Sequence, residues 1–191
     1  MRIERVFTVD GQSPYNDVEF RKTKSEIRHP DGSVVFAQND IEVPSDWSQV
    51  ACDVLAQKYF RKAGVPRRLR TVEEESVPRW LWRCEADDGA LASLHPDERE
   101  IGESSAKQVF DRLAGTWAYW GWKAGYFDAD SDARAFYDET RFMLSRQMCA
   151  PNSPQWFNTG LHWAYGIDGP AQGHYYVDPE TGETKPSQSA Y

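Results

Sequence analysis

The sequence lacks any run of apolar residues that approaches the roughly 18 needed by a membrane-spanning helix. Its hydrophobic content is 40% and its charged content is 27%, and its mean hydropathy is -0.72. Residues 1–5 mix charged and apolar side chains with no apolar stretch behind them, so no secretory leader is predicted. These absences exclude a transmembrane role and favour a cytoplasmic location.

Cysteine and paired histidine are also scarce. The three cysteines, Cys52, Cys84 and Cys149, are widely spaced and form no C-x-x-C pair, so neither a disulfide framework nor a zinc clip is predicted. The four histidines never recur at the spacing that would place two ligands on one helix face. We therefore expect free structural thiols and no metal site.

The chain has no excess of basic residues. It carries 22 Lys and Arg against 30 Asp and Glu, a net charge of -8, which opposes direct binding to nucleic acid or anionic lipid. One local exception lies between Lys58 and Arg70, where six basic residues occur without an acid. The favoured interpretation is a solvated helix end, and the alternative is an anion site for a regulatory nucleotide or a partner.

The first 44 residues have the composition of strands and tight turns. Residues 2–9 predict a first strand that ends at Asp10 and Gly11. Residues 18–36 predict a hairpin whose turn contains Pro30 and Gly32. Residues 40–43 predict a further short strand before Pro44. Together these elements form a small antiparallel β lobe.

The apolar spacing changes to the helical period after Pro44. A first helix is expected to begin at a cap on Ser45 or Asp46 and to end before Gly64. Residues 67–102 are typical of a connection with at most short helical turns.

A second helix is predicted to begin at Ser105, which fits a capping box with Gln108. A third is predicted from near Ser131 to Met148, with its end set by Pro151. The expected apolar stripe of the second helix comprises Ala106, Val109, Phe110, Leu113, Trp117 and Trp120.

Aromatic residues are abundant, at 14% with eight tryptophans. Three of the tryptophans fall within residues 116–122, inside the second predicted helix. Packing in the core or at an interface is the favoured interpretation, and the alternative is a platform on which sugars or bases stack. On the second hypothesis the chain is an acidic, Trp-rich binding module for a carbohydrate or protein, with Trp117, Trp120 and Trp122 exposed on one face.

The expected fold class is α+β, with a small N-terminal antiparallel β lobe followed by a mainly α-helical domain. We divide the chain into a β lobe (1–44), a helical domain (45–150) and the start of a further domain (151–191). A chain of 191 residues can bury such a core without disulfides.

The segment 151–158 is the strongest candidate site. It follows the third predicted helix and combines two prolines with a hydroxyl and side-chain amides. Because proline restricts the backbone, Asn152 and Ser153 can present donors to an anionic oxygen at little ordering cost. The alternative is an ordinary turn in which both side chains cap local backbone groups.

Several long segments resemble one protein family over essentially the whole chain. They are residues 45–66, 77–82, 105–117, 150–162, 163–170 and 173–179. These segments resemble the N-terminal region of the adenosylcobalamin-dependent (class II) ribonucleotide reductases of bacteria. By that resemblance Ser153 matches the hydroxyl residue that helps to bind the phosphate-bearing end of the substrate, Asn152 shapes the same pocket, and Trp156, Phe157 and Trp163 pack beneath it.

The resemblance implies the reduction of ribonucleotides, generally diphosphates, to 2'-deoxyribonucleotides for DNA synthesis and repair. In that family homolysis of the cobalamin Co–C bond generates a cysteine thiyl radical, and a cysteine pair supplies the two electrons. It also implies nucleotide effectors, a thioredoxin-type reductant and a catalytic α/β barrel, into which the helical domain leads, with residues 151–191 as the truncated start of the catalytic domain. Members are often dimers, although the contacts between subunits need not lie in this region.

The chain departs from the family in its cysteines. None of the three matches a catalytic position, and Cys149 is expected to be a structural thiol that closes the third helix. The chain also stops in a polar stretch, 185–191, with no predicted helix or strand. We therefore expect a fragment without reductase turnover of its own.

Overall fold

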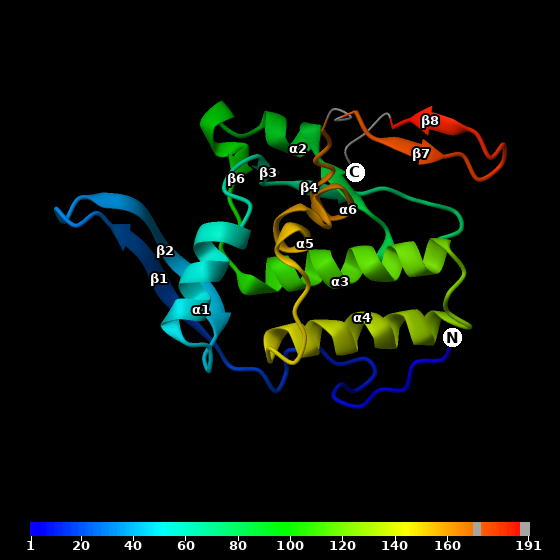
Figure 1. The fold of residues 1–191 in the computed structure, drawn as a ribbon, viewed down its shortest axis with the longest axis horizontal. Helices are drawn as coiled ribbons and strands as arrows, with labels where there is room; N and C mark the ends of the chain where they lie inside the picture. The colour runs from blue at the N-terminus through cyan, green and yellow to red at the C-terminus, as the bar shows by residue number, and fades with distance from the viewer. Residues whose placement is uncertain (170–172, 188–191) are drawn as a thin grey trace.

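The computed structural model describes residues 1–169 and 173–187, and it has the expected α+β architecture (Figure 1). A long antiparallel hairpin projects from one end of a body built around two helices, and the described part contains no helix that is long and apolar enough to cross a membrane. The elements in chain order are β1 (Phe20–Arg28), β2 (Val34–Pro44), α1 (Gln49–Val54), the π-helix η1 (Leu55–Tyr59), β3 (Val65–Pro66), β4 (Leu69–Thr71), the 3-10 helix η2 (Arg79–Leu81), β5 (Cys84–Ala86), α2 (Asp88–Ala92), the 3-10 helix η3 (Pro96–Glu98), β6 (Glu100–Ile101), α3 (Ala106–Lys123), α4 (Asp130–Ser145), α5 (Ser153–Asn158), α6 (Leu161–Tyr165), β7 (Tyr175–Val177) and β8 (Thr184–Pro186).

The β1–β2 hairpin confirms the hairpin prediction, but it is longer than expected. The separate strand predicted at 40–43 is wrong, because these residues continue β2. A bulge between the pairs Thr23–Ile41 and Ser25–Gln38 accommodates Asp40, whose φ is +57°. The bulge bends the strand so that Ile41 enters the core with no exposed surface.

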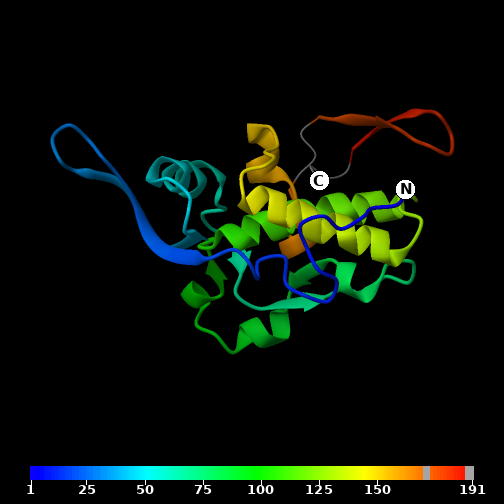
Figure 2. The same cartoon turned by 90° about the horizontal axis from the view of Figure 1, so that it is seen from below.

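The N-terminal strand predicted at 2–9 is also wrong, because residues 1–19 contain no strand. This segment instead runs along α4, as Figure 2 shows from below. The Glu139 carboxylate of α4 accepts hydrogen bonds from the amides of Phe7 (3.1 Å) and Thr8 (2.8 Å). Asp132 accepts from the Ile3 amide at 2.9 Å. Side chains of α4 therefore satisfy amides that a neighbouring strand would otherwise satisfy.

We expect Glu139→Gln to loosen this N-terminal segment. Burial raises the pKa of Glu139, but hydrogen bonds from Thr8 and from the amides of Phe7 and Thr8 outweigh it and lower the pKa below its ordinary value. The carboxylate therefore stabilises the fold above its unfolded pKa, and this stability is lost as the pH falls through the folded-state pKa. The expected loss on substitution at pH 7 is about 1–3 kcal/mol.

Hydrogen exchange at the Phe7 and Thr8 amides measures this effect. Protection in the unmodified chain should fall as the pH drops through the lowered pKa of Glu139, whereas Glu139→Gln should show low protection without that step. Equal protection in both proteins at pH 7 would contradict the prediction.

The first helix is shorter and begins later than predicted. Its N-cap is Ser48, whose Oγ accepts from the Ala51 amide at 3.2 Å, and not Ser45 or Asp46. It does not run to Gly64, because after Val54 the chain widens into η1 and becomes extended at Phe60. The side chains of Arg112 and Glu103 bind the backbone at Tyr59 and Arg61, as described below, so the helical hydrogen bonds do not continue past this point.

The second helix, α3, begins as predicted. The Ser105 hydroxyl accepts from the backbone, and the Gln108 side chain accepts from the Ser105 amide at 2.9 Å, which completes the capping box. The stripe is buried over its first four positions, but Trp117 is half-buried and Trp120 is 56% exposed, so the prediction for Trp120 is wrong.

The third predicted helix, α4, ends earlier than expected, at Ser145. Gln147 has a φ of +55°, and this left-handed residue stops the helix before Pro151 can. Met148, the last residue of the predicted helix, therefore lies beyond the end of α4 and is 55% exposed.

Residues 67–102 form the expected connection with short helical turns, but they also contain short strands that were not predicted. β3 pairs with β6, and β4 pairs with β5, both antiparallel. In the basic stretch, Lys58 lies in the last turn of η1, and Arg70 pairs with Glu85.

The strand pair β7–β8 occupies part of the C-terminal stretch expected to lack structure. Residues 188–191 of that stretch lie outside the described residues.

The main hydrophobic core surrounds α3. Its buried members are Ile41, Val43, Trp47, Cys52, Leu55, Ala56, Phe60, Ala106, Val109, Phe110, Leu113, Leu144 and Trp156. This cluster draws residues from both sides of the boundaries expected at 44/45 and 150/151. The division into three domains stays a prediction, whose third segment also includes residues 170–172 and 188–191, outside the described part.

Candidate functional site

Asn152 and Ser153 lie at the start of α5, on the surface of the molecule. Asn152 is the N-cap residue, but its side chain makes no capping hydrogen bond. The Ser153 Oγ lies 2.8 Å from the hydroxyl of Tyr59, at the end of η1. The Tyr59 ring in turn stacks on Trp156, with ring centroids 5.4 Å apart. Most of the segment 151–158 is therefore a short helix and not the ordinary turn of the alternative interpretation, and its first hydroxyl pairs with a tyrosine.

These residues border an open cleft of about 540 Å³. One wall is the exposed face of α1, where Val50 is 72% and Val54 is 37% exposed. The other wall consists of the residues that lead into α5. The lining residues are Trp47, Ser48, Val50, Ala51, Val54, Leu55, Tyr59, Gln147, Ala150, Pro151, Asn152, Ser153 and Trp156. The cleft thus offers neutral hydrogen-bonding groups at one edge and an apolar wall at the other.

A fully buried ion pair fixes the backbone of residues that line this cleft. Arg112 of α3 and Glu103 are both 0% exposed, and Arg112 Nε lies 2.7 Å from Glu103 Oε1. The Tyr165 hydroxyl donates to the same oxygen at 2.8 Å. Burial, together with the negative charge of Glu103, raises the pKa of Tyr165 well above its usual range, so its hydroxyl stays protonated.

The Arg112 guanidinium also binds three backbone carbonyls. It donates to Trp156 O at 2.7 Å, to Thr159 O at 2.7 Å and to Tyr59 O at 3.1 Å. The Glu103 carboxylate accepts from the Arg61 amide at 2.8 Å. One ion pair therefore holds the end of η1 and the end of α5 together, which ends the first helix early and places Tyr59 beside Ser153.

Sequence reasoning missed Tyr59, Glu103 and Arg112. Tyr59 is 94 residues from Ser153, and its place in the helical apolar spacing that follows Pro44 indicated only packing. Arg112 follows the buried residues Val109 and Phe110. The one available signal was a basic residue next to this apolar stripe, which is ambiguous because arginine on a helix is usually solvated.

The aromatic residues expected beneath the site differ in how far they are buried. Trp156 is 8% exposed and belongs to the core. Trp163 is half-buried, whereas Phe157 is 41% exposed and does not pack beneath the site. Trp117 and Trp122 are half-buried, so the structure lacks the exposed three-tryptophan face that the binding-module hypothesis requires.

The three cysteines are free, and none of them is among the residues that line the cleft. Cys52 is buried, Cys84 is half-buried, and Cys149 is exposed. Cys149 lies in the loop beyond α4, so the expectation that it closes a helix is wrong. Partial burial raises the pKa of its thiol and disfavours the reactive thiolate. No group of three or more metal-ligating side chains is assembled among residues 1–169 and 173–187.

Comparisons with known proteins agree on one family. A model of the class II vitamin B12-dependent ribonucleotide reductases matches residues 21–147. The vitamin B12-dependent ribonucleotide reductase of Bradyrhizobium diazoefficiens is 70% identical over 191 residues, and that of Agrobacterium fabrum is 66% identical over 191 residues. The similarity covers 100% of this chain but 15% of each relative. The reductase of Rhodopirellula baltica is 32% identical over 160 residues, which is 84% of this chain and 12% of the relative.

Proposed function

Because the chain belongs to the class II, vitamin B12-dependent ribonucleotide reductase family, we propose that it is the N-terminal part of an enzyme that reduces ribonucleotides to 2'-deoxyribonucleotides. Within it, Ser153 and Asn152 bind the phosphate-bearing end of the substrate. The observation that carries this assignment is the Ser153–Tyr59 hydroxyl pair at the edge of the open cleft.

The chain's own residues would bind and orient the substrate. A phosphate is anionic, and hydroxyl and amide donors bind it through charge-assisted hydrogen bonds without a cationic side chain. Tyr59 orients the Ser153 hydroxyl, and its stacking on Trp156 limits its motion. Arg112 is a positioning residue, because it binds the carbonyls of Tyr59 and Trp156 and not the cleft itself.

The finer features of the proposal come from the family. The substrate is a ribonucleoside diphosphate, the cofactor is the adenosyl form of cobalamin, and the chemistry proceeds through a thiyl radical. Nucleotide effectors and a thioredoxin-type reductant act on the whole enzyme, which forms a homodimer. The chain spans about 15% of the length of its relatives, so these properties belong to the full-length protein, and the chain alone is inactive.

The described cysteines do not fit the radical step. None of the three cysteines lines the cleft beside Ser153 or three further cavities among the described residues. No step of the reaction is therefore assigned to cobalamin within this chain.

We expect Ser153→Ala in the full-length reductase to raise the KM for a ribonucleoside diphosphate about tenfold or more, with a smaller change in kcat. The reason is the loss of a hydrogen bond to a charged group, worth about 1.5–3 kcal/mol. Tyr59→Phe should raise KM by a smaller factor, because it removes only the group that orients Ser153. Steady-state kinetics with diphosphate and triphosphate substrates measures both effects and the substrate preference.

Ser93→Ala is the matched control, since the Ser93 hydroxyl is exposed, donates to Ala90 O at 2.7 Å and lies outside the cleft. It should leave KM unchanged. An unchanged KM in Ser153→Ala would remove Ser153 from the substrate site.

A further inference from the structure

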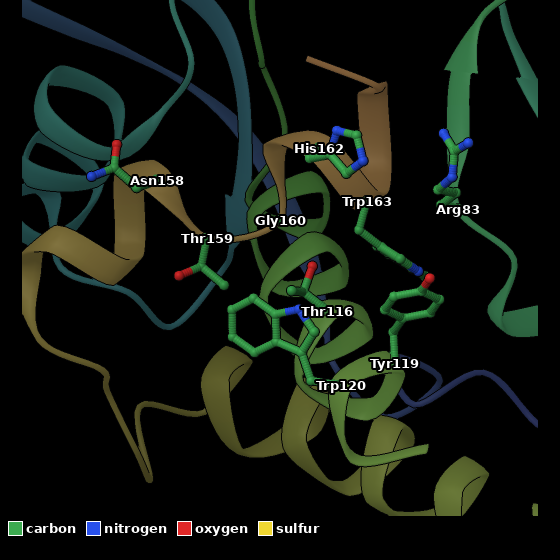
Figure 3. Close-up of a pocket in the computed structure, with 9 residues that line it drawn as sticks. All are labelled: Arg83, Thr116, Tyr119, Trp120, Asn158, Thr159, Gly160, His162 and Trp163. Atoms are coloured by element: carbon green, nitrogen blue, oxygen red, sulfur yellow. The ribbon is translucent and has the colours of Figure 1, made fainter. Parts of the chain in front are cut away.

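A second pocket, of about 390 Å³, lies at the other end of α5 (Figure 3). It is formed by the C-terminal half of α3, the turn between α5 and α6, and Arg83. It shares no lining residue with the cleft beside Ser153. The lining residues are Arg83, Thr116, Tyr119, Trp120, Asn158, Thr159, Gly160, His162 and Trp163.

Two buried polar atoms of this pocket have no partner among the described residues. Thr116 is 3% exposed, and its Oγ1 makes no hydrogen bond. The Nδ1 atom of His162 is likewise buried and unpaired. Buried polar groups are nearly always hydrogen-bonded. Both residues line the pocket, so a small rotation of their side chains would give a bound ligand two polar groups that have no other partner.

The aromatic walls of the pocket are held in place. The Trp163 indole donates to Leu81 O at 3.0 Å, and the Tyr119 hydroxyl donates to Glu74 at 2.7 Å. Trp163 also packs so closely on Gly115 that a Cβ there would lie 2.2 Å from its ring. Trp120 is 56% exposed, and Figure 3 shows its ring beside Thr116. Trp163 and Tyr119 are therefore fixed walls, and the exposed ring of Trp120 beside them offers a face on which a planar ligand can stack.

The polar side chains lie around the rings. In Figure 3, His162 and Arg83 lie along one rim of the pocket, opposite Trp120 and Tyr119, and Thr116 lies between the rims. Arg83 is half-buried and has one long contact, 3.4 Å, to Glu85, which also pairs with Arg70. The Arg83 guanidinium therefore retains donors for an anionic group.

We propose that this pocket binds a small planar aromatic molecule that carries an anionic group. The ring stacks on Trp120, its polar edge bonds to Thr116 and His162, and the anion binds Arg83. The proposal goes beyond the phosphate-binding role of Ser153, since it concerns different residues and a ligand with a defined aromatic part.

Equilibrium dialysis on the full-length reductase tests the proposal with four probes. Indole-3-acetate carries the ring and the anion, indole carries the ring alone, and acetate carries the anion alone. AMP carries both features in a nucleotide. We expect saturable binding of indole-3-acetate or AMP, weaker binding of indole, and none of acetate. Tighter binding of AMP would identify the ligand as a nucleotide, and tighter binding of indole-3-acetate would identify it as a simple aromatic acid.

Variants then locate the bound probe. Trp120→Ala should weaken binding about tenfold through lost stacking, and Thr116→Val about threefold through one lost hydrogen bond. Arg83→Gln should reduce the affinity for indole-3-acetate to that for indole. Tyr126→Ala is the matched control, because Tyr126 is an exposed aromatic residue outside the pocket, and it should bind normally.

Three results would overturn the proposal. The first is that no probe binds saturably at millimolar concentration, which would indicate that another part of the chain fills the pocket. The second is that Trp120→Ala and Thr116→Val bind as tightly as the unmodified protein. The third is that Ser153→Ala, and not Trp120→Ala, abolishes binding, because the probe would then occupy the other cleft. Loss of substrate affinity in Ser153→Ala with normal probe binding separates this proposal from the proposed function.

Discussion

Replacing Arg112 with methionine should lower the free energy of unfolding of the chain by about 3–5 kcal/mol. The substitution leaves the Glu103 carboxylate in the core with no exposed surface and without its ion-pair partner. It also removes the donors to Trp156 O, Thr159 O and Tyr59 O. Urea denaturation at pH 7, followed by tryptophan fluorescence, measures the loss.

A double variant separates the charge from the packing. Arg112→Met combined with Glu103→Gln removes both charges while keeping similar volumes, so it should recover part of the lost stability. The recovery is incomplete, because the three carbonyls remain without donors. A loss below about 1 kcal/mol in the single variant, or no recovery in the double variant, would show that the ion pair does not hold this region together.

Gly160→Ala should destabilise the chain by about 3 kcal/mol or more. Gly160 has a φ of +88°, and a Cβ on it would lie 2.3 Å from the backbone oxygen of Arg112. The left-handed conformation by itself costs about 1–2 kcal/mol for a residue with a Cβ. The clash adds to this cost, because its partner is backbone within α3 and cannot rotate away.

Gly11→Ala is the matched control for this substitution. Gly11 has a φ of +73°, and nothing lies within 4 Å of the position that a Cβ would occupy there. It should therefore show the conformational cost alone, about 1–2 kcal/mol. Equal losses at the two glycines in urea denaturation would mean that α6 shifts freely relative to α3, contrary to the close approach in the structure.

Local rules were enough to predict the parts of the fold that depend on neighbours in the chain. The hairpin turn contains Pro30 and Gly32, and the start of α3 depends on Ser105 and Gln108, three residues apart. Helical spacing also located the helices, because periodicity needs no knowledge of the partner surface. The family resemblance placed Ser153 in the candidate site, but it did not identify the residue beside it.

Distant contacts decided the remaining features. Residues 2–9 have strand-forming composition, yet Glu139 of α4 binds their amides in place of a strand. The first helix stops at η1 because Arg112 and Glu103 bind the backbone there. These outcomes depend on groups 40 or more residues away, which propensity and periodicity do not consider.

The sequence alone established the α+β class, the hairpin, the two long helices and the likeness to one reductase family, because each depends on local pattern or on long matching segments. Tertiary structure established the pairing of Tyr59 with Ser153, the burial of Arg112 with Glu103, and the pocket that contains Thr116. Whether a polar side chain is solvated or buried depends on which surfaces pack over it. That packing exists only once residues far apart in the chain have come together.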